Sequence, residues 1–209
     1  MSFYRYNAYP KGRKMKGIET FLILGLVFTM FTSAINKTVE TGNNIRSETL
    51  RLHIIANSDT ETDQNLKFKV RDAVLEATGE LFSEVSGKTE AVSAAEYSAN
   101  DIKEIAENVI RSEGFDYNVQ VDVTEMWFET RSYEGFTLPA GDYDAVRIII
   151  GKGEGKNWWC VMYPALCVPG AEEAIEKYGK NSYFIEGEEF EMRFKIIEWI
   201  EEIKQLLKK

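Results

Sequence analysis

The pattern of hydrophobic and polar positions divides the chain into three parts. Residues 21–35 read FLILGLVFTMFTSAI, a run of fifteen positions without a charged side chain. Residues 36–48 are polar and show no periodicity, which is typical of a linker or stalk. From residue 49 onward, short apolar runs alternate with amphipathic stretches. This pattern predicts a single folded domain over residues 49–209.

The folded part begins with a strand pattern followed by helical patterns. Residues 50–56 alternate and then become apolar, as in a strand that enters a core. A turn rich in helix-capping residues leads to a predicted helix over about 61–82, and a second predicted helix runs from Gly87 to near Gly114. Further elements are predicted in chain order: strands over 117–124, 145–150 and 158–163, turns at 138–141 and 151–155, and helices near 171–178 and over 190–207. Together they predict an α+β fold, with helices packed on a largely antiparallel sheet and an N-terminal hydrophobic export or anchor helix in front.

The N-terminal 35 residues are typical of an export signal. Five basic residues precede the apolar run, and Glu19 is the one acidic residue in this part of the chain. The run is shorter than the roughly 20 residues of a spanning helix, but Ile18 and Thr20 extend it. A cleaved signal and a membrane anchor over residues 18–35 are therefore both open. A buried core helix is less consistent with five basic residues directly before it. Because positive charge stays in the cytoplasm, residues 36–209 are predicted to lie outside it.

The charge of the chain is divided in the same way. Residues 1–35 carry five basic residues and one acidic residue, so the rest carries −13 although the whole chain carries −9. Such an acidic domain is repelled by nucleic acid and by anionic lipid headgroups, so neither is expected as a partner.

Few residues suggest enzyme chemistry. His53 precedes Asn57-Ser58-Asp59, but residues this close along one strand cannot approach a substrate from three directions as a catalytic triad does. We expect Asn57, Ser58 and Asp59 to cap a helix, and His53 to be half-buried in a strand. One histidine and two cysteines are too few for a metal site, and no cofactor is expected. Residues 151–156 (GKGEGK) lack the spacing of a phosphate-binding loop, so a hairpin turn is predicted there.

The two cysteines of the chain flank Pro164. In an extracytoplasmic domain, Cys160 and Cys167 are each other's available partner, and a disulfide across this turn is predicted. The alternative is that both serve as small core residues.

Four blocks of this sequence resemble the stage II sporulation protein R family. They are LRLHIIANSD at residues 50–59, LPAG at 138–141, NWWCV at 157–161 with Pro164 and Leu166-Cys167, and RFKIIEW at 193–199. One departure is Ala165, where the family usually shows a second proline before Leu-Cys.

The resemblance implies an intercompartmental signal of endospore formation. Family members are made in the forespore and exported into the space between the two septal membranes. There they activate a membrane-embedded aspartic protease, which leads to processing of the early mother-cell sigma factor precursor. The resemblance thus implies an activating ligand and not an enzyme. The alternative is an exported or anchored hydrolase of the septal wall that uses acids such as Asp59 and Asp63.

A partner surface is expected where the first strand meets the first helix of the domain, since exposed corners often carry recognition residues. The candidates are His53, Asn57, Asp59 and Asp63. The competing interpretation is that this corner serves only to cap the helix.

Overall fold

The computed structural model describes residues 17–133, 136–164, 166, 198, 199, 203, 206 and 207. The helices are α1 (Gly17–Ser47), α2 (Glu61–Glu84), α3 (Lys88–Tyr97) and α4 (Ala99–Ser112). The strands are β1 (Leu50–Ile55), β2 (Val119–Phe128), β3 (Arg131–Tyr133), β4 (Phe136–Leu138), β5 (Gly141–Ile150) and β6 (Asn157–Tyr163). The helix predicted near 171–178 lies outside the described residues, as does most of the one predicted over 190–207. The chain divides into two compact units, Met1–Lys37 and Thr38–Lys209.

Helix α1 contains the apolar run and continues beyond it. An 18-residue window of this helix has a mean hydropathy of 1.9 and none of it is buried, so by length and composition it could cross a membrane. A signal sequence near the N-terminus has the same properties, so α1 is compatible with export or with anchoring.

Residues 36–47 are helical, which differs from the irregular linker expected over 36–48. No proline interrupts them, and the end of the helix is tied to the folded unit. Ile45 is fully buried, and Nη1 of Arg46 donates a hydrogen bond of 2.7 Å to the carbonyl of Ala140. In the division of the chain into compact units, the residues from Thr38 onward belong to the folded unit, and the predicted start of the domain at residue 49 stays a prediction.

The main sheet has the strand order β2-β5-β1-β6. β1 pairs with β5 in parallel, whereas the pairs β1–β6 and β2–β5 are antiparallel. The sheet is thus mixed, and the expectation of a largely antiparallel sheet was wrong for its central pair. The reason is that β5 and β6, which are neighbours along the chain, lie on either side of β1. Alternation along a strand shows which residues share a face, but it does not show which strand lies beside it.

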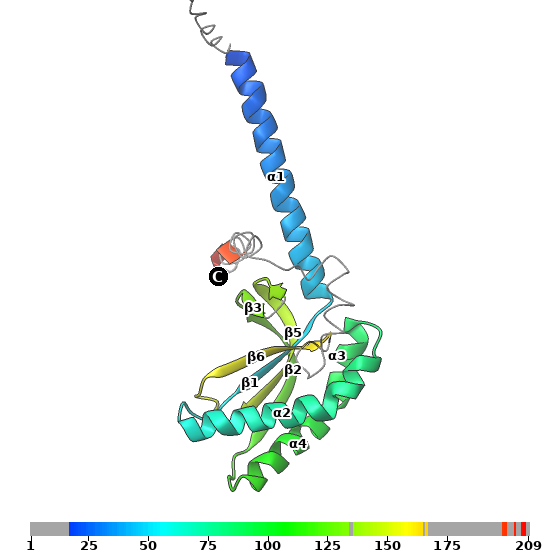
Figure 1. Ribbon diagram of the computed structural model, residues 1–209, viewed down its shortest axis with the longest axis vertical. Helices are drawn as coiled ribbons and strands as arrows, with labels where there is room; N and C mark the ends of the chain where they lie inside the picture. The colour runs from blue at the N-terminus through cyan, green and yellow to red at the C-terminus, as the bar shows by residue number, and fades with distance from the viewer. Residues whose placement is uncertain are drawn as a thin grey trace, which may run out of the picture. The chain divides into compact units, whose positions relative to one another are not determined.

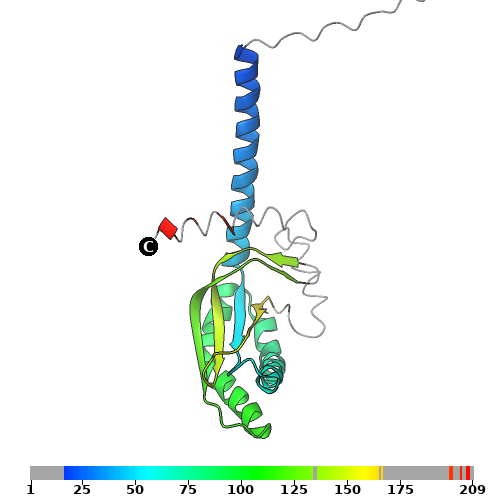
Figure 2. The ribbon, with the colours of Figure 1, turned by 90° about the vertical axis from the view of Figure 1, so that its left-hand side faces the viewer.

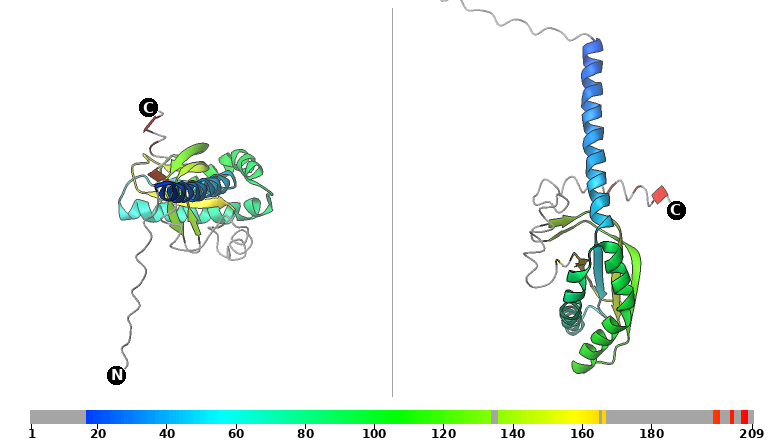
Figure 3. Two further views of the ribbon diagram at one scale, coloured as in Figure 1. Left: turned by 90° about the horizontal axis from the view of Figure 1, so that it is seen from above. Right: turned by 90° about the vertical axis from the view of Figure 1, so that its right-hand side faces the viewer.

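Helices α2, α3 and α4 pack on one face of this sheet (Figure 1). Two further views show β2 and β5 on the far side of the unit from α2 (Figure 3). Leu52 and Ile54 of β1 meet Val70 and Val74 of α2 in the core. The second predicted helix is in fact two, because the chain leaves the helical conformation at Ser98, which has φ −89° and ψ 4° and lies between α3 and α4.

Strands β2 to β5 form one long bent hairpin with a break in the middle (Figure 2). The turn predicted at 138–141 lies at this break and not at a hairpin tip. The hydroxyl of Tyr143 donates to the carbonyl of Pro139 at 2.6 Å, and Arg46 bonds the next carbonyl. Gly141 has φ +149°, and a Cβ there would lie 2.6 Å from Cδ of Arg46, so the position favours glycine.

The glycine-rich loop at 151–156 is not the hairpin turn that we expected. Because β1 lies between β5 and β6, the loop must cross the end of β1. There its backbone meets residues 56–58: the N–H of Gly155 bonds the carbonyl of Ala56 at 2.9 Å. A Cβ on Gly155 would lie 2.3 Å from the carbonyl oxygen of Ser58, so no side chain fits.

Candidate functional site

The four residues predicted as partner contacts lie in two separate places. Asn57, Asp59 and Asp63 lie at the corner between β1 and α2. His53 lies on β1, on the face of the sheet opposite helices α2–α4, which we call the second face. The structure therefore does not bring His53 together with the other three.

The corner is built around the carboxylate of Asp63. Its Oδ2 accepts hydrogen bonds from Nδ2 of Asn57 at 2.8 Å and from Oγ of Ser58 at 2.5 Å. The helix cap is Thr60, whose Oγ1 accepts from the N–H of Asp63 at 3.3 Å, and not one of residues 57–59 as predicted. Burial by itself would raise the pKa of Asp63, but hydrogen bonds from Ser58, Asn57, Tyr117 and Thr60 lower it below the ordinary value.

The same corner also holds the loop at 151–156. Oδ1 of Asn57 accepts from the N–H of Lys152 at 3.0 Å, and Oδ1 of Asp59 accepts from the N–H of Lys156 at 2.7 Å. The ammonium group of buried Lys67 donates to the carbonyl of Lys156 at 2.9 Å. All three candidates at the corner thus have partners inside the molecule. A recognition role for them stays a prediction, and exposed Asp59 is the best placed to have one.

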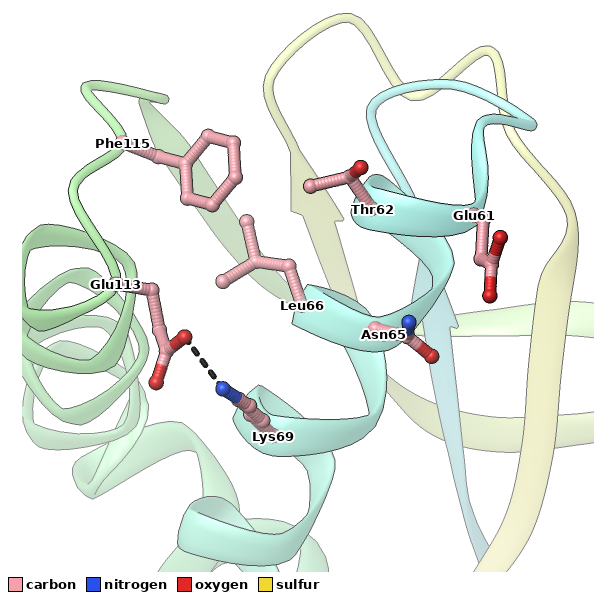
Figure 4. Close-up of a pocket in the computed structure, with 7 residues that line it drawn as sticks. All are labelled: Glu61, Thr62, Asn65, Leu66, Lys69, Glu113 and Phe115. Carbon is pink, nitrogen blue, oxygen red and sulfur yellow. Dashed lines mark hydrogen bonds and ion pairs between the residues drawn. The ribbon is translucent and has the colours of Figure 1, made fainter.

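A hollow of about 230 Å³ lies between the start of α2 and the chain after α4 (Figure 4). Leu66 and Phe115 point toward each other across it, and Lys69 forms an ion pair with Glu113 at one side. These two charges neutralise each other, which leaves Glu61 as the remaining charge of the lining, so the hollow offers little to attract an anion.

The second face carries a row of polar and aromatic residues that crosses all four strands. In the strand register, Asp122 of β2 lies opposite Arg147 of β5, Arg147 opposite His53 of β1, and His53 opposite Trp159 of β6. Nη2 of Arg147 bonds Oδ2 of Asp122 at 3.1 Å. Arg51 precedes His53 by two residues on β1, so it lies on the same face, opposite Ala145 of β5.

His53 is held by neighbours of the second face. Its ring stacks on Trp159 at 3.7 Å between ring centroids, and its Nε2 lies 2.9 Å from Oδ1 of Asn157. Ser58, the serine nearest to His53 along the chain, bonds Thr60 and Asp63 instead. Among the described residues, the structure thus does not assemble a Ser-His-Asp triad.

Burial holds His53 in the neutral form. The pKa of His53 is lowered from 6.5 to about 4, mainly by burial; the hydrogen bond with Asn157 opposes this shift, and the positive charges of Arg147 and Arg51 add to it. The imidazole is therefore uncharged at neutral pH.

His53→Gln should make the protein less sensitive to mild acid. The unfolded chain protonates His53 near pH 6.5 and the folded chain only near pH 4, so the histidine costs stability as the pH falls through this window. From pH 7 to pH 5 the wild type should lose about 2 kcal/mol of unfolding free energy that the variant keeps. Urea denaturation of both proteins at the two pH values measures the difference. Equal losses in both would show that His53 titrates near its ordinary pKa when folded.

Arg51 is the most unusual side chain of this face. It is fully buried, its Cζ lies 4.0 Å from the ring centroid of Phe128 and 5.1 Å from that of Tyr143, and its Nη2 donates to the hydroxyl of Tyr133 at 2.7 Å. Its Nε and Nη1 have no hydrogen-bond partner in the part of the chain that the structure describes. Burial lowers the pKa of Arg51, as expected for a cation among aromatic rings.

The two arginines of this face were not among the predicted site residues, although the sequence contains a signal for them. Arg51 stands in LRLHII, where His53 is the other polar residue, and Arg147 stands in the otherwise apolar run AVRIII. A charged residue within such a run is unusual, because burying a cation is costly unless it is paired.

Within the described ranges, no group of three or more His, Cys, Asp or Glu side chains is placed to hold a metal ion. Cys160 is buried on β6, but Cys167 lies outside the described residues, so the predicted disulfide stays a prediction.

Comparisons with known proteins agree with the resemblance. A family model described as Stage II sporulation protein R (spore_II_R) matches residues 46–173. The "Stage II sporulation protein R" of Bacillus subtilis (strain 168) is 33% identical over 158 residues, which cover 71% of this chain and 70% of that protein. No solved structure matches. The matched segment begins at Arg46 and includes both the corner and the second face.

Proposed function

Because this chain belongs to the stage II sporulation protein R family, we propose that it is an exported signal that activates a membrane-embedded aspartic protease by direct contact. Membership of the family supports a role in sporulation. Activation of the protease would lead to processing of the early mother-cell sigma factor precursor. In this proposal the chain is made in the forespore and acts in the space between the septal membranes.

The observation that carries the proposal is the order of the two units. Helix α1 is an apolar N-terminal element that is compatible with export or anchoring, and a folded unit follows from Thr38. A ligand that signals between compartments needs both parts: a means of leaving the cell that makes it, and a folded surface to present outside.

The alternative, a septal-wall hydrolase, has less support. A glycosidase of the usual kind needs one carboxylic acid with a raised pKa that donates a proton and a second carboxylate that stays ionised. The pKa of Asp63 is lowered, and its carboxylate is already occupied by Asn57 and Ser58. Asp59 bonds the backbone of Lys156. Both acids thus support the fold rather than acid–base chemistry.

Replacing residues 1–35 by an unrelated cleavable signal should preserve signalling. The exchange keeps residues 38–47, which belong to the folded unit. Processing of the sigma factor precursor in sporulating cells is the readout, with export checked by cell fractionation. The matched control replaces residues 1–47 by the same signal; it removes Ile45 and Arg46 from the folded unit and should abolish signalling. If the first variant is exported normally but processing is lost, the protein must stay attached to the membrane by its own N-terminal helix in order to signal.

A further inference from the structure

We propose that the second face of the sheet binds a side-chain carboxylate, aspartate or glutamate, of the protein that this chain activates. The proposal rests on the proposed function, which supplies a protein partner outside the cytoplasm. Arg147 is the partly exposed cation of the row, and Trp159 and Asn157 line a hollow at the β6 end of the row.

The first observation is a set of buried polar atoms without hydrogen-bond partners. Among the described residues, the unpaired donors are Nε and Nη1 of Arg51 and Nε of Arg147, which lie on the second face in two adjacent rows. Nδ1 of His53 is also unpaired, but it is the acceptor nitrogen of a neutral ring whose Nε2 faces Oδ1 of Asn157. Buried donors are nearly always paired in folded proteins, because each unpaired one costs free energy. Their concentration on one face indicates that an acceptor is missing there.

The second observation is the local charge. The second face holds two guanidinium groups, whereas Asp122 is the only carboxylate bonded to either of them among the described residues. The described neighbours of Arg51 are aromatic rings and a tyrosine hydroxyl. In a chain that is otherwise strongly acidic, this face has a local excess of positive charge, which complements an anion.

The third observation is a hollow beside this row. It has a volume of about 230 Å³, and its lining is Trp127, Phe128, Glu129, Arg131, Asn157 and Trp159. His53 contacts two of these, since it stacks on Trp159 and bonds Asn157. Small-molecule sites usually occupy roughly 300–1,000 Å³, so a hollow of this size fits a single side chain better. Half-buried tryptophans around an arginine are also typical of the centre of a protein interface.

The chemistry of the face favours a carboxylate over a phosphate. A carboxylate is planar and matches the fork of a guanidinium group with two parallel hydrogen bonds. Asp122 and Glu129 lie at the edges of the site and would repel a doubly charged phosphate more strongly than a singly charged carboxylate. The side chain of Arg147 is 34% exposed, so it can turn its free edge toward a ligand without leaving Asp122.

The test is a titration of the full-length chain, in detergent micelles, with a synthetic hexaglutamate peptide. Tryptophan fluorescence is the signal that reports binding. We expect saturable binding by the wild type, at least tenfold weaker binding by Arg147→Gln, and loss of the fluorescence change in Trp159→Phe. The matched control is Arg111→Gln: Arg111 lies on α4 and pairs with Glu107 at 3.4 Å, so the same charge is removed from an ion pair on the helix side of the sheet. This control should bind like the wild type. If Arg147→Gln does not fold, as judged by thermal melting, Asn157→Ala at the exposed start of β6 takes its place.

Three results would overturn the proposal. The first is absence of binding, or equal weakening in Arg147→Gln and Arg111→Gln, which would mean a nonspecific charge effect. The second is competition by inorganic phosphate that is stronger than competition by acetate, which would make the ligand a phosphate. The third is binding that appears only after Glu186, Glu188, Glu189 and Glu191 are changed to glutamine, which would assign the site to the chain's own acidic segment.

A second readout separates this site from the proposed function. In sporulating cells, Arg147→Gln should be exported at the wild-type level while precursor processing falls at least tenfold, and Arg111→Gln should process normally. Normal processing by Arg147→Gln would overturn the assignment of the ligand to the activated partner. The peptide titration does not depend on signalling, so it still reports on the site if the proposed function fails.

Discussion

A chain that carries both Leu24→Lys and Phe28→Lys should remain in the cytoplasm and send no signal. Both side chains lie in the apolar window of α1 and are largely exposed, at 62% and 66%. A lysine near the centre of an inserting helix costs about 2.5–3.5 kcal/mol, so two cost roughly 5–7 kcal/mol and reverse the preference for the membrane. Cell fractionation and protection from added protease measure the result.

The control for this experiment is Leu24→Ile with Phe28→Leu. It changes the same two positions but keeps them apolar, so export should be unchanged. Export of the double-lysine chain at the wild-type level would show that α1 is not the element that carries the chain across the membrane.

Asp63→Ala should lower the unfolding free energy by about 3–5 kcal/mol, because a buried carboxylate that accepts several hydrogen bonds leaves its donors unsatisfied when it is removed. Asp63 is 4% exposed, and its loss leaves Nδ2 of Asn57 and Oγ of Ser58 without this acceptor. Since Asn57 also holds the loop at Lys152, the loop should loosen as well. Urea denaturation gives the free energy, and hydrogen exchange at residues 151–156 gives the effect on the loop.

The matched control is Glu61→Ala, in the same first turn of α2 but exposed. It should cost about 0.3–1 kcal/mol, the usual value of an acid near the start of a helix. A similar small loss for Asp63→Ala would contradict the structural role of the corner.

The pH dependence provides an independent check on Asp63. Its folded pKa lies below the unfolded value, so its contribution is fully present above the unfolded pKa and is lost as the pH falls toward the folded pKa. The difference in stability between wild type and Asp63→Ala should therefore shrink in acid below about pH 4.

The corner variants also decide between structure and recognition. Asp59→Ala removes an exposed carboxylate whose described contact is the N–H of Lys156, and it should cost only about 0.5–2 kcal/mol, as for other capping groups. If Asp59→Ala keeps its fold but loses signalling, the corner carries part of the recognition surface. If it signals normally, the contact with the partner lies elsewhere, and the second face is the structural candidate.

Local periodicity predicted most of the individual elements. The strand predicted over 50–56 is β1, and the helix predicted over about 61–82 is α2, because apolar spacing of two or of three to four residues reports on a single segment. The same approach failed at Ser98, where two amphipathic helices follow each other without a proline or glycine between them. It also gave no helix over 36–47, where polar residues are helical and where Ile45 is buried and Arg46 bonds the carbonyl of Ala140.

The candidate site was only partly predictable. His53, Asn57, Asp59 and Asp63 were close in sequence, but β1 ends at Ile55 and the chain then turns into α2, so His53 stays on the second face of the sheet and the other three lie at the corner. Asn157, which bonds His53, lies more than 100 positions away along the chain. No local pattern indicates such a contact.

By itself, the sequence determined the apolar N-terminal helix, the acidic character of residues 36–209, and the family, since each of these depends on residue type and order alone. Only the tertiary structure decided that β1 lies between β5 and β6, and with it the mixed sheet. The same pairing places Arg147, His53 and Trp159 in one row. The physical reason is that backbone hydrogen bonds between strands have the same chemistry for every residue pair. The choice of neighbour is therefore made by the packing of the whole core and not by any one segment.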